Sequence, residues 1–136
     1  MNKKIIIIDG NALIHRSFHA LPTTLKTKTG QITNAAYGFT SFLIKALNDI
    51  KPNYAVLTLD RKAPTFRHAS YDKYKATRVK APQELYDQIP MVKKIIQAFS
   101  IPIFEMDGYE ADDLIGTITT IINKQEPKTE TIIITG

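Results

Sequence analysis

Residues 4–10 read KIIIIDG, a run of four isoleucines that ends at an aspartate and a glycine. A continuous β-branched run is typical of a strand that is buried on both faces of a parallel sheet. The Asp9-Gly10 pair is a turn signal, so the strand is expected to end there. This stretch therefore predicts a buried strand at residues 5–8, with an acid directly after it.

Predicted strands and helices alternate along the rest of the chain. Apolar side chains at helical spacing predict helices over residues 34–50, 85–99 and 111–122, and apolar runs predict strands at 54–59, 101–104 and 131–135. Asn34 is a plausible N-cap of the first of these helices. Pro90 lies inside the second helical pattern, which predicts a kink or two short helices there. The alternation indicates an α/β fold with a mostly parallel sheet flanked by helices.

Length and composition exclude several classes of protein. The 136 residues suffice for one domain, and 43% hydrophobic with 23% charged residues is the composition of an ordinary globular protein. No apolar run approaches the roughly 20 residues of a membrane helix, and no secretory signal is visible, so a cytoplasmic location is expected. The absence of Cys excludes disulfides, thiol nucleophiles and Cys-ligated zinc.

The positive charge is concentrated in one segment. The chain has a net charge of +5, but residues 61–80 alone hold seven Lys or Arg and a single acid, Asp72. Three aromatic residues, Phe66, Tyr71 and Tyr74, lie within this basic segment. Such a segment is typical of a surface that binds a polyanion, and an ordinary solvated loop explains the charge equally well.

Two acids follow two predicted strands. Asp9 comes after the first strand and Asp60 after the second. If these strands are parallel neighbours, both carboxylates lie at the carboxyl edge of the sheet, where open α/β sheets bind their ligands. The alternative is that each Asp only forms a turn or caps a helix.

A third acidic feature opens the last predicted helix. Glu110, Asp112 and Asp113 place three carboxylates within four residues. The helix dipole favours acids at this position by about 0.3–1 kcal/mol each, but crowded like charges repel one another. A hard cation such as Mg²⁺ or Mn²⁺ would relieve this repulsion, since these ions prefer oxygen ligands. Five carboxylates beside a basic segment predict a metal-dependent nuclease or phosphatase.

Several long motifs then resemble a known family. They read IIIIDGNALIHRSFHAL, NAAYGF, LDRKAPTFRH, YKATR, GYEADDLIGT and TIIITG, and they extend over the whole chain. Together they resemble the 5′-nuclease domains of the flap endonuclease family, such as that of bacterial DNA polymerase I. The resemblance implies a Rossmann-like (PIN-like) sheet with a metal site at its carboxyl edge. It also implies Mg²⁺- or Mn²⁺-dependent hydrolysis of DNA with 5′ ends, flaps or nicks, as in replication and repair.

The resemblance also assigns roles to individual residues. Asp9, Asp60, Glu110, Asp112 and Asp113 match the family's acidic residues, which serve mainly the first of two metal ions, some through water. Lys75 and Arg78 match residues that contact the scissile phosphate from a basic arch, at about residues 61–82 here. The residues that the resemblance implies for DNA binding are Arg67, His68, Tyr74, Lys75, Arg78 and Lys80. An ion pair of Arg67 with Asp60 or a neighbour remains an equal alternative.

The family pattern continues beyond the last residues of this sequence. The family has an Asp-x-Asp pair, further acids and a helical DNA-binding module after the strand that ends here at Thr135-Gly136. Residues 1–136 are therefore expected to be the N-terminal part of a 5′-nuclease domain, with an incomplete second metal site. A non-catalytic nucleic-acid-binding fragment and a PIN-like ribonuclease remain alternatives. The expected chain is a monomer with no organic cofactor and no membrane contact.

Overall fold

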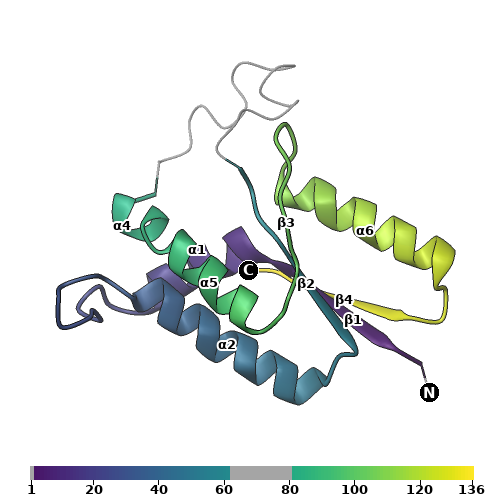
Figure 1. Cartoon of the computed structure of the whole chain (residues 1–136), viewed down its shortest axis with the longest axis horizontal. Coiled ribbons are helices and arrows are strands. Elements are labelled where there is room, and N and C mark those ends of the chain that lie inside the picture. The colour runs from purple at the N-terminus through teal and green to yellow at the C-terminus, as the bar shows by residue number, and fades with distance from the viewer. Residues whose placement is uncertain (1, 62–80) are drawn as a thin grey trace.

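The computed structural model describes residues 2–61 and 81–136, which form a parallel sheet flanked by helices (Figure 1). The strands are β1 (Lys4–Asp9), β2 (Tyr54–Thr58), β3 (Ile103–Phe104) and β4 (Glu130–Ile134). They lie in the order β3-β2-β1-β4, and each neighbouring pair is parallel. The α/β fold with a parallel sheet is therefore confirmed, and each predicted strand is present to within about two residues.

Five helices connect these strands in the described part of the chain. They are α1 (Gly10–Ala20), α2 (Asn34–Ile50), α4 (Gln83–Tyr86), α5 (Ile89–Ala98) and α6 (Ala111–Gln125). Pro90 lies in the first turn of α5, where its missing N–H costs nothing, so the prediction of two short helices is confirmed. The sequence interpretation did not include α1, which begins directly after β1. Its buried residues Leu13, Ile14 and Phe18 carry the helical spacing that would have indicated it.

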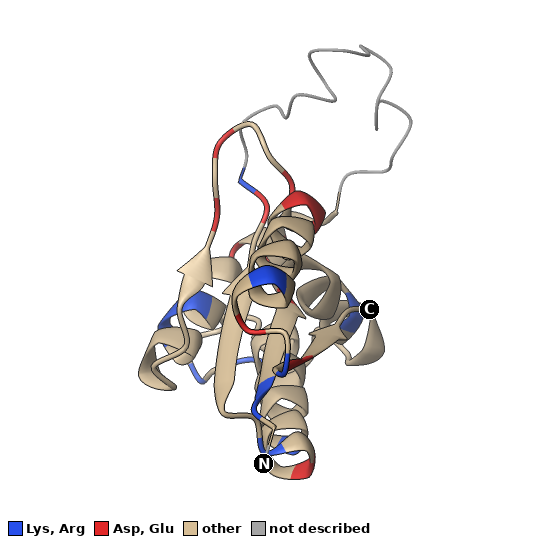
Figure 2. Ribbon diagram, turned by 90° about the vertical axis from the view of Figure 1, so that its right-hand side faces the viewer, with Lys and Arg blue, Asp and Glu red and all other residues tan. Residues whose placement is uncertain are grey.

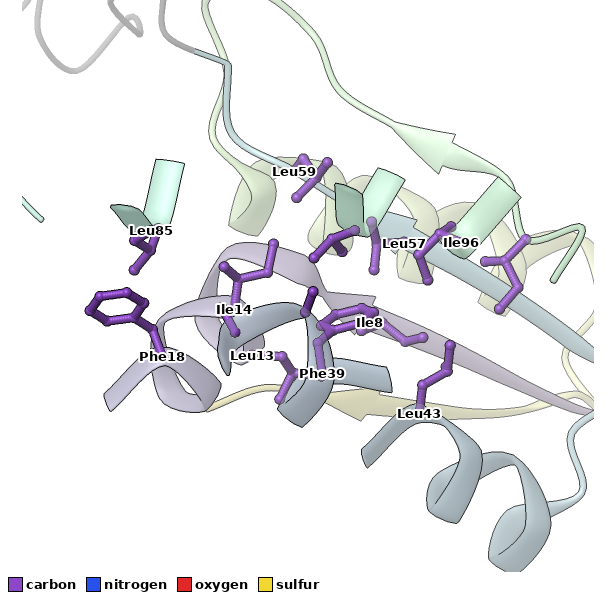
Figure 3. Packing of buried hydrophobic residues seen from close by; sticks show 14 of the residues in the cluster. Ile8, Leu13, Ile14, Phe18, Phe39, Leu43, Leu57, Leu59, Leu85 and Ile96 are labelled. Carbon is purple, nitrogen blue, oxygen red and sulfur yellow. The ribbon is translucent and has the colours of Figure 1, made fainter. Parts of the chain in front are cut away.

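The hydrophobic core lies between the sheet and α1, α2, α4 and α5 (Figure 3). Alternate residues of a strand point to opposite faces, and Ile6 and Ile8 belong to this core. Ile5 and Ile7 are also buried and point to the other face, which α6 covers (Figure 1). Ile115 of α6 is buried as well. The four isoleucines are thus buried on both faces of the sheet, as the sequence predicted.

The prediction that Asn34 caps α2 is wrong. Thr33 is the N-cap residue, and Asn34 is the first residue of the helix. Its side chain is fully buried and donates to the backbone oxygens of Phe18 and Leu21, at 2.8 and 3.0 Å. Asn34 therefore satisfies carbonyls at the end of α1 instead of N–H groups at the start of α2.

The sheet order creates a switch point at the carboxyl end of β1. The chain passes from β1 to β2 and β3 on one side, and it returns through α6 to β4 on the other side. Gly10 lets the end of β1 approach β2 closely, because a Cβ at this residue would lie 2.7 Å from Leu59 Cδ2 and 2.8 Å from the Thr58 oxygen. Ligands of doubly wound sheets bind at such a switch point.

None of the helices in the described ranges is long and apolar enough to cross a membrane.

Candidate metal centre

Asp9 is the last residue of β1 and the N-cap of α1. Its side chain is 8% exposed, and both carboxylate oxygens accept hydrogen bonds. Oδ1 accepts from the backbone N–H of Ala12 at 3.2 Å, and Oδ2 accepts from the Thr135 hydroxyl at 3.1 Å. The capping alternative considered for Asp9 is thus present in the structure, together with its position at the switch point.

Asp60 follows β2 and connects three parts of the molecule. Its backbone N–H donates to Asn11 Oδ1 of α1 at 2.7 Å. Its own Oδ1 accepts from the backbone N–H of Ala111, the first residue of α6, at 2.6 Å. Asp60 therefore joins the end of β2 to the starts of α1 and α6, and it brings the acidic start of α6 to the same edge of the sheet as Asp9.

The acids at the start of α6 have different environments. Glu110 is the N-cap residue and is 8% exposed, whereas Asp112 is exposed. Glu110 and Asp113 form a capping box, in which Asp113 Oδ2 accepts from the Glu110 backbone N–H at 2.9 Å. The helix-terminus explanation therefore applies to this pair, and a role for Asp113 as a metal ligand stays a prediction.

Negative charge gathers at this edge of the sheet. Figure 2 shows red segments at the start of α6 and in the loop before it. They lie near Arg61, the last residue of the first described range. Burial raises the pKa of the Asp9 carboxyl, and the negative charges of Asp112 and Asp60 raise this pKa further, while hydrogen bonds from Ala12 and Thr135 oppose the rise. Burial is the main cause of this rise, and the charges of Asp112 and Asp60 add to it from the same edge of the sheet.

The acidic side chains in the described ranges nevertheless do not form a preformed site with three direct ligands for an ion. Within residues 2–61 and 81–136, no three acidic or histidine side chains lie close enough together to hold one ion directly. The structure brings together Asp9, Asp60 and the start of α6, and their identity as metal ligands stays a prediction. All of their donor atoms are carboxylate oxygens, which suit a hard ion that keeps several of its waters.

Six predicted DNA-binding residues lie outside the described ranges. They are Arg67, His68, Tyr74, Lys75, Arg78 and Lys80. Arg61, the last residue described before them, forms ion pairs with two acids in the loop before α6. Its Nε lies 2.6 Å from Asp107 Oδ1, and its guanidinium lies 3.2 Å from Glu105 Oε1, which also pairs with Lys93. These contacts attach the base of the basic segment to the loop that leads into α6.

Two uncharged residues at the acidic edge were absent from the sequence interpretation. Asn11 contacts Asp60, and Thr135 contacts Asp9. Thr135 is the last residue of the strand predicted at 131–135, so its position at a carboxyl strand end was the signal that could have indicated it. Asn11 has no such signal, because its contact depends on how closely α1 begins beside β2.

The chain matches a known protein family over nearly its whole length. The family model described as the N-terminal resolvase-like domain of 5′-3′ exonucleases matches residues 4–136. The chain belongs to this 5′-3′ exonuclease family. The membership confirms the resemblance that the sequence motifs indicated.

The curated relatives of this 5′-3′ exonuclease domain include bacterial DNA polymerases I. DNA polymerase I of Bacillus subtilis is 42% identical over 122 residues, and that of Caldicellulosiruptor bescii is 41% identical over 133 residues. These alignments cover 90% and 98% of this chain but only 14% and 15% of the relatives. The chain therefore spans about one seventh of the length of each polymerase.

Solved structures of bacteriophage T5 proteins share the fold of the exonuclease domain. The T5 D15 protein co-crystallised with metal ions has a TM-score of 0.73 at 18% identity, covering 98% of this chain and 50% of that chain. The T5 D15 flap endonuclease in a complex with DNA and metal ions has a TM-score of 0.71 at 17% identity, covering 95% and 48%. These similarities confirm the Rossmann-like, PIN-like architecture.

Proposed function

We propose that this chain carries the metal-binding carboxylates of a 5′-3′ exonuclease or flap endonuclease that hydrolyses phosphodiesters of DNA. The observation that supports the proposal most strongly is the position of Asp9 and Asp60. They lie at the carboxyl ends of two parallel neighbouring strands at the switch point of the sheet, and Asp60 is hydrogen-bonded to the first residue of α6. Relatives at about 42% identity are DNA polymerases I, and T5 flap endonuclease with the same fold was crystallised with DNA and metal ions.

The residues present fit a hydrated Mg²⁺ or Mn²⁺. Asp9, Asp60 and Asp112 each offer only oxygen donors, and the charges of Asp112 and Asp60 add to the rise in the pKa of Asp9 that burial causes. Mg²⁺ usually binds through one or two carboxylates and keeps several waters, so fewer than three direct protein ligands suffice. A divalent ion bound here would lower the pKa of an attacking water and neutralise charge on the scissile phosphate.

The chain's own groups would do the remaining work. Asp9 and Asp60 would orient the ion, since hydrogen bonds from Thr135 and Ala111 fix their carboxylates. Lys75 and Arg78 would hold the scissile phosphate, and the other basic residues of the segment would hold the DNA backbone. Because phosphate contacts carry no sequence information, binding is expected to depend on salt and on DNA shape more than on base sequence.

A non-catalytic nucleic-acid-binding role is the second candidate. Two observations favour it: the positive charge is concentrated in residues 61–80, and no three acids in the described ranges form a direct ion cage. In this alternative the carboxylates at the sheet edge serve as helix caps and loop anchors. The two candidates differ in whether cleavage depends on both the metal and Asp60.

The test is cleavage of a labelled 5′-flap DNA beside a single-stranded RNA, in Mg²⁺, in Mn²⁺ and in a chelator. We expect metal-dependent cleavage of the flap, because an ion held at the acidic edge would activate the attacking water. Asp60→Asn should abolish cleavage. Asp49→Asn is the matched control, since Asp49 is exposed on α2 and pairs only with Lys45 among the contacts in the described chain.

Each outcome separates the candidates. Flap cleavage that requires metal and Asp60 supports the 5′-nuclease, and preferential cleavage of the RNA supports a PIN-like ribonuclease. Salt-sensitive DNA binding without cleavage by any variant supports the non-catalytic role. Cleavage that survives both chelation and Asp60→Asn would contradict the proposed metal centre.

A further inference from the structure

Two uncharged side chains contact the two aspartates at the strand ends. The Thr135 hydroxyl donates to Asp9 Oδ2 at 3.1 Å, and Asn11 Oδ1 accepts from the Asp60 backbone N–H at 2.7 Å. Thr135 follows β4 and Asn11 lies in the first turn of α1, so the two contacts come from two different elements beside the acidic edge. Neither residue carries a charge that would itself attract a metal ion.

We propose that Thr135 and Asn11 are positioning residues of the metal centre. Thr135 fixes the orientation of the Asp9 carboxylate. Asn11 fixes the position of the Asp60 backbone, which follows β2. This inference rests on the proposed function, because it assigns the two residues to the same carboxylates.

An Asp carboxylate held by one hydrogen bond can still turn about its terminal bond. The terminal torsion of Asp has broad minima, so one hydrogen bond to Oδ1 leaves the second oxygen free to turn. The Thr135 hydroxyl holds this second oxygen from β4, whose register is fixed by its pairing with β1. A carboxylate has about four acceptor sites, so two remain for an ion after the hydrogen bonds from Ala12 and Thr135.

Asn11 reaches Asp60 because α1 begins close to the end of β2. Gly10 brings the start of α1 against the Thr58 oxygen, which places the Asn11 amide within reach of the Asp60 N–H. The Asp60 carboxylate in turn accepts from the Ala111 N–H. Loss of the Asn11 contact would therefore also loosen the attachment of α6 to the sheet edge.

Partners that orient metal ligands are worth about 10–100-fold in metal affinity in proteins. For Thr135→Val we expect Mn²⁺ binding, measured by calorimetry, to weaken about tenfold, and Thr135→Ser should restore it. Thr120→Val is the matched control, because Thr120 is exposed on α6 and its hydroxyl bonds only to the Gly116 backbone oxygen among the described contacts. Urea unfolding of the two valine variants checks that Mn²⁺ binding is compared between folded proteins.

A second readout requires no metal. In the metal-free protein, Thr135→Val should change the side-chain NMR couplings of Asp9, and Asn11→Ala should speed hydrogen exchange of the Asp60 amide. Asn11→Asp keeps an acceptor oxygen and should restore the protection of this amide. If the couplings and the exchange change while the wild-type chain binds no Mn²⁺, positioning is supported and the proposed metal function fails.

The inference is overturned if the Asp9 couplings and the Mn²⁺ affinity of Thr135→Val both match those of Thr120→Val. It is also overturned if Thr135→Ser behaves like Thr135→Val, because the hydroxyl would then have no role.

Discussion

Two polar regions of this protein are built in opposite ways. Asn34 and Gln88 are fully buried, and their amides satisfy each other and nearby backbone groups through every N–H and oxygen that they possess. At the acidic edge, Asp9, Asp60 and Asp112 bring like charges together, and the pKa of Asp9 is raised. The amide pair thus stabilises the fold, whereas a buried carboxyl with a raised pKa is typical of a functional site.

The largest expected loss of stability comes from breaking the buried amide pair of Asn34 and Gln88. Asn34→Ala should lower the free energy of unfolding by about 3 kcal/mol, because two buried carbonyls and the Gln88 amide lose a partner. Urea unfolding measures this loss. Gln83→Ala is the control, since its exposed amide bonds to Asp87 and its removal should cost less than about 0.5 kcal/mol. Equal losses in the two variants would remove the distinction between the buried pair and an ordinary surface contact.

A divalent ion should stabilise the acidic edge and leave the amide pair unaffected. Mn²⁺ at ten times its dissociation constant should raise the free energy of unfolding by about 1.4 kcal/mol, since it binds only the folded chain. Asp9→Asn should remove this stabilisation, while Asn34→Ala should retain it. Thermal unfolding with and without Mn²⁺ provides the comparison, and an equal gain in Asp9→Asn would place the ion elsewhere.

The acidic edge should also make stability depend on pH. Because the pKa of Asp9 is raised in the folded protein, the folded state binds a proton at higher pH than the unfolded state does. The resulting stabilisation is complete below the ordinary value of 3.8 and is lost as the pH rises through the folded pKa. Urea unfolding from pH 3 to pH 7 should show this loss in wild type and a flatter profile in Asp9→Asn. Parallel profiles would contradict the burial of an ionisable Asp9.

The ion pairs of Arg61 should have the smallest effect. Its side chain is 45% exposed and that of Asp107 is 70% exposed, so solvent screens their attraction. Arg61→Met should cost about 0.5 kcal/mol at low salt and less at 1 M salt, measured by urea unfolding. Lys45→Met, at the more exposed pair with Asp49, should cost no more than this. A loss above about 2 kcal/mol would mean that the base of the basic segment is part of the core.

The sequence predicted the sheet well because burial leaves a simple pattern. Ile5–Ile8 are buried on both faces of the sheet, and the helical spacing of α2, α5 and α6 reflects the faces that pack on it. Helix α1 was missed because its start is dominated by the Asp9-Gly10 turn signal, although Leu13, Ile14 and Phe18 pack in the core. A turn signal such as Asp9-Gly10 marks the end of a strand. It does not show that a helix, here α1, begins directly afterwards without a loop.

The sequence predicted those site residues that lie at the carboxyl ends of strands. Asp9 and Asp60 could be placed together from the sequence, since parallel neighbouring strands end at one edge. The contacts of Asn11 and Thr135 could not, because they depend on the close approach at Gly10 and on the position of β4 beside β1. Asn34 was misassigned for a similar reason: its partners are Phe18 of α1 and Leu21 directly after α1, 16 and 13 residues away in sequence.

Paramagnetic broadening by Mn²⁺ tests the central claim most directly. In an amide NMR spectrum of the chain, substoichiometric Mn²⁺ should broaden the signals of residues 9–12, 58–61 and 110–113 and of Thr135. The signals of residues 34–36 and of Gln88 should stay sharp, and Asp9→Asn should abolish the selective broadening. Uniform broadening, or broadening centred on the exposed acids Asp49 or Glu126, would contradict a metal centre at the carboxyl edge of the sheet.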